Sequence, residues 1–248
     1  MAATPRDQDR AVAVSGHDNL AQPPGGRDPT RRRRDAAVAG HAGDQEAARA
    51  ALVDPDGRVR ATALGALCRM GSLTAADLAA GLTDPDPGVR RRAAELAGRS
   101  GAEMAGPAGA GAPPGGEDRA ADVPAGLSAQ LAAALLDREP AVVEAVAWAL
   151  GELGDPATVT ALASVAGDHP DPLCREAAVA ALGAVGDPSG LEAILAAMAD
   201  RPAVRRRAVI ALAPFEGPEV EDAVRRATGD RDWQVRQAAE DLLGDAGD

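Results

Sequence analysis

A polar turn followed by apolar positions at helical intervals recurs along the chain. In the segment LTDPDPGVRRRAAELAG (82–98), the turn precedes Val89, Ala93, Leu96 and Ala97, which share one face of a helix. Similar segments occupy residues 52–68, 135–151, 167–183, 198–214 and 228–244. Each segment therefore predicts an amphipathic helix that begins after a turn of Asp, Pro or Gly.

The spacing of these segments indicates a repeat protein. The residue after the first apolar position is, in order, Arg60, Arg90, Val143, Arg175, Arg205 and Arg236. The intervals are 30, 53, 32, 30 and 31 residues. Residues 101–126 are rich in Gly, Ala and Pro without an apolar period, so they explain the long interval and predict a flexible insertion. Residues 27–44 match the second half of the unit and predict an N-terminal capping helix, and residues 1–26 are expected to be disordered.

Each unit has room for a first helix before the turn. Asp155-Pro156 and Asp187-Pro188 place a capping carboxylate before a proline, and Thr74 to Asp77 resembles a capping box. One helix pair cannot bury its own apolar face, whereas a stack of pairs can. We therefore expect an all-α fold, an α-solenoid of the ARM/HEAT type with about six helix-pair repeats after the capping helix, over residues 27–248. The repeats are predicted near 44–71, 72–100, 127–154, 155–186, 187–216 and 217–244.

Aspartate and arginine recur at fixed positions around the turn. Such carboxylates can cap the second helix while the arginine reaches a turn of the same or the neighbouring repeat, which predicts a structural ladder of Arg and Asp. The alternative is a column of arginines that binds phosphate. The ladder residues are Asp54, Arg60, Asp84, Arg90, Arg175, Arg205, Asp230 and Arg236. The column breaks at Val143, just after the insertion, which suggests a discontinuity of the stack there.

Charge and composition narrow the classes of partner. The formal charge is −12, all 26 basic residues are Arg, and residues 1–34 carry a net +3. An acidic body repels phosphate backbones, so nucleic-acid binding is not expected. No apolar run is long enough to span a membrane or to form a signal peptide, and the two cysteines form no CxxC pair. We therefore expect a monomer in a reduced cytoplasmic compartment, without a membrane.

The turn and helix pattern D-x-D-P-x-V-R-x-x-A-x-x-A-L-G-x-x-G-D resembles the PBS-lyase HEAT-like repeat family over roughly residues 28–244. The chain is also similar to actinobacterial HEAT-repeat proteins, and its Lys-free composition suits a high-GC genome. The resemblance implies the fold and leaves the chemistry open. A lyase-like or tetrapyrrole-binding protein is one alternative that it implies, and a weak nucleic-acid binder of the helical-repeat DNA glycosylase type is another. Di-iron hydroxylases with this type of repeat use His-Glu dipeptides, and none of the three histidines here precedes Glu.

No catalytic or metal-binding constellation is evident in the sequence. The histidines and cysteines are too dispersed for a closed zinc site, and without Lys there is no phosphate-binding loop of the GxxxxGK type. Cys174 takes a position that is Val in most units and is predicted to be a small core residue, whereas Cys68 is expected to be partly exposed. We expect neither a cofactor nor a metal.

The second helices are expected to line the concave surface of the stack. Counting from the first apolar residue after the turn, positions two and six lie one helical turn apart and away from the apolar face. The predicted partner-binding residues at these positions are Arg91, Glu95, Glu144, Trp148, Glu176, Arg206, Ile210 and Gln237. Trp148 is either a binding anchor or a filler beside the insertion, and Trp233 is expected to cap the core. The sequence thus favours a non-catalytic scaffold that binds a protein or peptide partner.

Overall fold

The computed structural model describes residues 28–104 and 126–245, and within them the side chains of 28–99 and 126–244. The described residues form helices and no strand. The α-helices are α1 (Pro29–Ala42), α2 (Gln45–Ala50), α3 (Gly57–Arg69), α4 (Ala75–Leu82), α5 (Pro87–Met104), α6 (Leu127–Ala134), α7 (Pro140–Leu153), α8 (Val159–Asp168), α9 (Pro172–Val185), α10 (Leu191–Ala197), α11 (Pro202–Ala211), α12 (Pro218–Ala227) and α13 (Trp233–Asp245). Short 3-10 helices are η1 (Ala51–Val53), η2 (Pro156–Thr158) and η3 (Pro188–Gly190). The predicted disorder of residues 1–26 and most of the predicted insertion lie outside the described residues.

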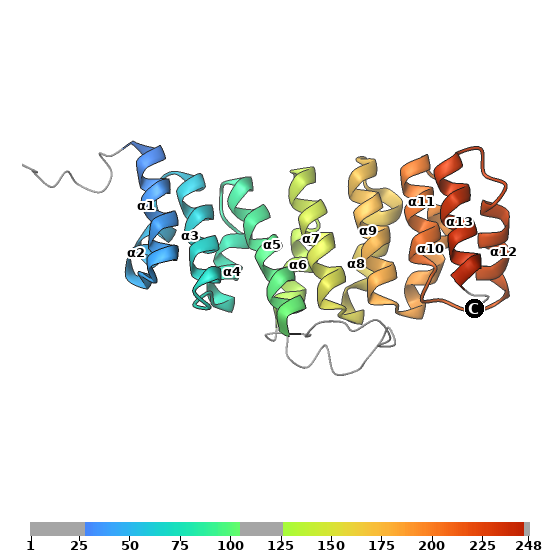
Figure 1. The fold of residues 1–248 in the computed structure, drawn as a ribbon, viewed down its shortest axis with the longest axis horizontal. Helices are drawn as coiled ribbons and strands as arrows, with labels where there is room; N and C mark the ends of the chain where they lie inside the picture. The colour runs from blue at the N-terminus through green and yellow to red at the C-terminus, as the bar shows by residue number, and fades with distance from the viewer. Residues whose placement is uncertain (1–27, 105–125, 246–248) are drawn as a thin grey trace, which may run out of the picture.

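The helices form two rows that run along the length of the molecule (Figure 1). The odd-numbered helices contact one another in order from α1 to α13, and each even-numbered helix from α2 packs on the odd-numbered helix that follows it. We call these rows the odd row and the even row. The described part of the chain is therefore a capping helix followed by six helix pairs, and the predicted α-solenoid is confirmed.

Local sequence signals begin and end the helices. The Asp56 and Asp171 side chains accept hydrogen bonds from the backbone N–H two residues later, and so cap α3 and α9. The predicted capping box between Thr74 and Asp77 is present at the start of α4. Gly154 ends α7 with a left-handed backbone at φ 66°. These caps make each helix short enough to fit one repeat.

The apolar face predicted from the sequence is buried. Val89, Ala93, Leu96 and Ala97 of α5 are at most 2% exposed. They belong to one apolar cluster that continues from α3 to α13 and includes Val143, which is fully buried. The suggested discontinuity of the stack at Val143 is therefore wrong, because α5 and α7 pack directly on each other.

Helix α5 is longer than the sequence predicts. It continues to Met104, so residues 101–104 are helical and do not belong to a flexible insertion that starts at residue 101. Ala102, Glu103 and Met104 all favour helix, and the single Gly101 costs too little to end it.

Small residues let the odd-row helices approach closely. A Cβ atom at Gly183 would lie 2.7 Å from the Ala211 Cα atom, and one at Gly98 would lie 3.0 Å from the Ala149 Cα atom. Any larger side chain at these contacts would push successive repeats apart.

Candidate partner-binding surface

An arginine in the first turn of most odd-row helices joins two successive repeats. Arg60 donates from Nε and Nη2 to the Asp84 carboxylate at 2.8 and 2.6 Å, and from Nη1 to the Asp54 carbonyl oxygen at 2.7 Å. The guanidinium therefore holds its own turn and the turn of the next repeat at once. The same pairing recurs between Arg90 and Asp137, Arg175 and Asp200, and Arg205 and Asp230.

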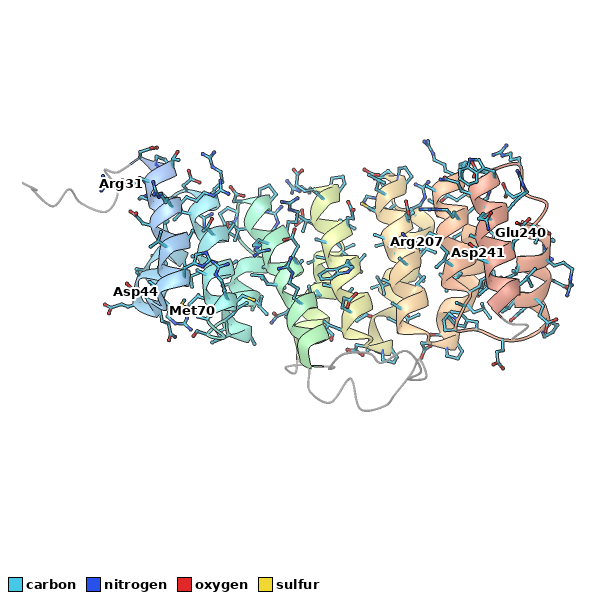
Figure 2. The ribbon with its side chains drawn as sticks, viewed as in Figure 1. Arg31, Asp44, Met70, Arg207, Glu240 and Asp241 are labelled. Carbon is cyan, nitrogen blue, oxygen red and sulfur yellow. The ribbon has the colours of Figure 1, made fainter. Side chains whose placement is uncertain are left out.

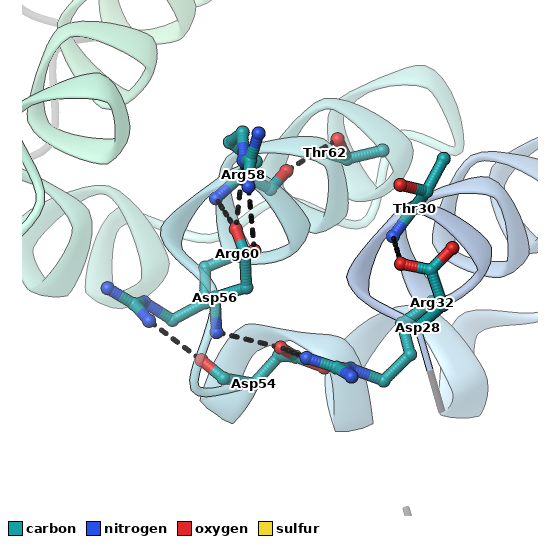
Figure 3. A network of polar contacts seen from close by, with 8 residues as sticks. All are labelled: Asp28, Thr30, Arg32, Asp54, Asp56, Arg58, Arg60 and Thr62. Atoms are coloured by element: carbon teal, nitrogen blue, oxygen red, sulfur yellow. Dashed lines mark hydrogen bonds and ion pairs between the residues drawn. The ribbon is translucent and has the colours of Figure 1, made fainter. Parts of the chain in front are cut away.

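At the N-terminal end, Arg32 of the capping helix pairs with Asp54 at 2.8 Å (Figure 3). We call these five Arg–Asp pairs the ladder. Each ladder aspartate also accepts a hydrogen bond from a backbone N–H in its turn, as Asp84 does from Asp86 N at 2.8 Å. Hydrogen bonds from Arg90, from Arg175 and from Arg205 lower the pKa of the Asp137, Asp200 and Asp230 carboxyls, respectively. The ladder therefore keeps its carboxylates ionised between the repeats.

The structure connects the predicted ladder residues with three that the sequence interpretation missed. Arg32, Asp137 and Asp200 supply the remaining partners. Asp137 stands six residues before Val143, as Asp54 and Asp84 do before their arginines, and Asp200 stands five before Arg205. An alignment of the turns that allows one missing residue could therefore have found both. Arg236 donates only to the Asp230 carbonyl oxygen, at 2.8 Å, because no repeat follows it in the described chain.

One rung of the ladder is replaced on both sides. Val143 stands where the other repeats have the arginine, and His169 stands in the next turn where its aspartate partner is expected. Val143 is buried. His169 contributes only its backbone to the ladder, because Arg175 donates from Nη1 to the His169 carbonyl oxygen at 2.7 Å. The paired replacement leaves neither a buried arginine nor a buried aspartate without its partner, which is why the stack tolerates it.

Two hollows lie on the side of the odd row that faces away from the even row, which we call the outer face. The first has a volume of about 700 Å³ and extends across α5, α7 and α9 to Arg207 of α11. The second has a volume of about 390 Å³ and lies between α11 and α13. Arg207 and Asp241, both labelled in Figure 2, belong to the first and the second hollow respectively.

All eight predicted partner-binding residues line one of these hollows. The first contains Arg91, Glu95, Glu144, Trp148 and Glu176. The second contains Arg206, Ile210 and Gln237. The predicted residues thus fall into two separate groups.

The sequence interpretation missed Glu152, Leu173 and Arg207 of the first hollow. Glu152 lies one further turn along the stripe of Glu144 and Trp148, so extending that stripe would have found it. Leu173 and Arg207 lie at other repeat positions, and no pattern in the sequence marks them.

Trp148 lies on the first hollow and also contacts the neighbouring repeat. Trp148 is 41% exposed, which is unusual for the largest apolar residue. The Trp148 ring lies close to Gly98 of α5, because a Cβ atom at Gly98 would be 2.6 Å from the ring atom Cζ3. The ring is therefore fixed by α5 while part of it stays available to a ligand.

Trp233 does not cap the core as expected. It is the first residue of α13, it is 64% exposed, and it lines the second hollow. Its turn position holds a solvent-facing proline in several other repeats, such as Pro140 and Pro202, so a side chain there points away from the core.

The charges of the first hollow are only partly balanced. Arg91 and Arg92 lie 3.5 and 3.1 Å from the Glu95 carboxylate, and Arg207 lies 3.5 Å from the Glu176 carboxylate. The buried Arg207 Nε atom has no hydrogen-bond partner within the described part of the chain. Within the same part of the chain, Glu144 and Glu152 make no side-chain ion pair or hydrogen bond. The hollow therefore presents two uncompensated carboxylates beside an exposed indole.

The cysteines take different environments. Cys174 is fully buried, as predicted for a core residue, and burial raises the pKa of its thiol to about 11. Cys68 is half-buried. Among the side chains of residues 28–99 and 126–244, no three from His, Cys, Asp or Glu are grouped in a way that could hold a metal ion. None of the helices within residues 28–104 and 126–245 is both long and apolar enough to cross a bilayer.

Comparisons with known proteins agree with a helical-repeat fold. A family model described as HEAT repeats matches residues 46–108 and 128–203. An engineered protein of known structure is 20% identical, with a TM-score of 0.57 over 81% of this chain and 95% of its own length. Importin beta is 15% identical, with a TM-score of 0.56 over 87% of this chain and 33% of its own. A designed armadillo repeat protein is 15% identical, with a TM-score of 0.50 over 83% of this chain and 98% of its own. A search of curated proteins finds no match for the chain.

Proposed function

The chain belongs to the HEAT-repeat family, and we propose that it is a non-catalytic scaffold that binds a partner protein along the outer face of its odd row. The first hollow is the principal contact in this proposal, and the second hollow extends the same surface toward the C-terminal end. Stacked repeats suit such a role because they build one long, rigid surface from many short helices.

The observation that carries the proposal is the exposed Trp148 in the first hollow. Tryptophan is enriched among residues that dominate binding energy, above all where it lies centrally and is ringed by other contacts. Trp148 is on the middle one of the three helices that contribute most of the hollow, with α5 on one side and α9 on the other. A partner segment laid across these helices would bury the exposed part of the indole.

The test is affinity capture with the purified chain from a lysate of its source organism, quantified by mass spectrometry. We expect Trp148→Ala to lower the recovery of the bound partner at least tenfold, because truncating a central tryptophan costs about 2 kcal/mol or more in binding. Ile210→Ala in the second hollow is expected to lower it less, because a smaller apolar contact is lost.

Leu136→Ala is the matched control for these variants. Leu136 is 87% exposed and lies in the turn before α7, outside both hollows. Its loss should leave the recovery unchanged, and circular dichroism should show the same helical signal for all variants. Equal recovery with Trp148→Ala and Leu136→Ala would contradict the proposal.

A further inference from the structure

We propose that the first hollow recognises a basic segment of a partner protein, which presents an arginine or lysine side chain to Trp148. This inference rests on the proposed function and adds the chemistry of the partner. Three features of the hollow support it: an acid–aromatic–acid stripe, a surplus of carboxylates, and apolar lining residues.

The stripe runs along α7. Glu144, Trp148 and Glu152 follow one another at intervals of four residues, so they lie on one face in successive turns. A cation over an indole face is attracted by the ring, and a carboxylate on each side along the helix adds to that attraction. The stripe thus combines both kinds of group that favour a guanidinium or an ammonium.

The charge balance of the hollow favours the same ligand. Four glutamates and two arginines line it, and Arg92 also pairs with Glu95, so the hollow and its ion-pair partners keep one excess negative charge. Glu95 and Glu176 face Arg91 and Arg207, and the uncompensated pair on α7 remains. The whole chain carries a formal charge of −12, and such a field attracts basic segments and repels acidic ones during encounter.

The apolar lining of the hollow suits the rest of a long basic side chain. Ala145, Ala177, Ala181 and Leu173 are among its lining residues, and Leu173 is 57% exposed. The methylene groups of arginine and lysine pack on such apolar surfaces while the charged end reaches polar groups. The second hollow differs because Arg206 places a positive charge in it, so it does not share this preference.

The test is a selection of random twelve-residue peptides displayed on phage, against the full chain and in parallel against the Trp148→Ala variant. Enrichment of Arg and Lys among peptides that need Trp148 would support the inference. Peptides that need Trp148 but are neutral or acidic would overturn the basic partner and leave the scaffold proposal standing. The absence of any peptide that depends on Trp148 would overturn both.

Two variants with the same change in net charge separate a local effect from a general one. Glu144→Gln with Glu152→Gln removes the two carboxylates of the stripe, and we expect it to weaken a selected basic peptide roughly tenfold. Glu192→Gln with Glu240→Gln removes two exposed carboxylates that line neither hollow, and should change the affinity less than twofold. Equal weakening by both pairs would contradict local recognition.

The absence of lysine from the chain allows a direct map of the contact. Carbodiimide coupling joins a carboxylate to an amine, so a bound lysine peptide should be linked to Glu144 or Glu152. Peptide mapping after trypsin cleavage identifies the linked residue. Links that fall only outside the first hollow would contradict the inference.

Discussion

The ladder makes a quantitative prediction about stability at its last complete rung. Arg205→Met keeps an apolar stem of similar length and removes the guanidinium, whose side chain is only 6% exposed. The Asp230 carboxylate, 17% exposed, then loses its two hydrogen bonds from Arg205 at 2.9 and 2.7 Å, and the Asp200 carbonyl oxygen loses one at 2.8 Å. Breaking a buried pair on one side costs about 3–5 kcal/mol, and the partial exposure of Asp230 reduces this to about 2–4 kcal/mol.

Arg236→Met is the matched control for this variant. It is the same substitution at the same repeat position, but among the described residues Arg236 has only the Asp230 carbonyl oxygen as a partner. We expect it to cost about 1 kcal/mol or less. Thermal unfolding followed by circular dichroism should therefore lower the Tm by roughly 5–15 °C for Arg205→Met and by no more than about 3 °C for Arg236→Met.

Hydrogen exchange locates the effect. Because repeats are stabilised mainly by their neighbours, Arg205→Met should speed amide exchange in α12 and α13 more than in the N-terminal repeats. Equal Tm values for the two variants, or a uniform change in exchange, would refute the idea that the ladder couples successive repeats.

Three further predictions concern the ladder and the core. Folding lowers the pKa of the ladder aspartates, so their contribution to stability is present above about pH 4 and is lost as the pH falls through the folded pKa values. The free energy of unfolding, measured from about pH 6 to about pH 3, should therefore fall less steeply in Arg205→Met than in the wild type. Val143→Arg alone should destabilise the chain because it buries an unpaired charge. Adding His169→Asp should recover at least about 1 kcal/mol of the free energy of unfolding in a double-mutant cycle. Simple additivity of the two changes would contradict the idea that Val143 and His169 together replace one rung of the ladder. The buried Cys174 thiol, with its pKa raised to about 11, should resist a disulfide reagent at pH 8 until the chain unfolds, and rapid modification of it in the native state would contradict its placement.

The sequence predicts the repeat and its apolar face well because both follow from a simple period. Val89 and the three apolar residues that follow it in the pattern are buried because a helix that packs on its neighbours must hide one stripe. The ladder is harder to predict, because a period tells where Arg90 and Asp137 lie in their repeats and does not tell that they pair across the insertion. Val143 shows the same limit, since its meaning depends on His169 in the next repeat.

The candidate partner-binding surface is predictable only in part, for a related reason. Positions two and six of the pattern identify the outer face of each odd-row helix, so Glu144, Trp148 and Ile210 all lie on a hollow. How far a long side chain reaches is not periodic, and Arg207 extends to Glu176 of the previous repeat. The prediction that Trp233 caps the core is wrong because a large apolar residue suggests burial, whereas its position in the turn exposes it.

We propose that the first hollow binds a partner through Trp148, and the fluorescence of this residue can test the claim. The chain has two tryptophans, so Trp233→Phe leaves Trp148 as the sole indole reporter. Titration of this variant with a peptide selected on the wild-type chain should give a saturable shift of the emission to shorter wavelength, because binding removes water from the exposed part of the ring. Calorimetric binding of the same peptide with an unchanged Trp148 emission would place the contact elsewhere and contradict the claim.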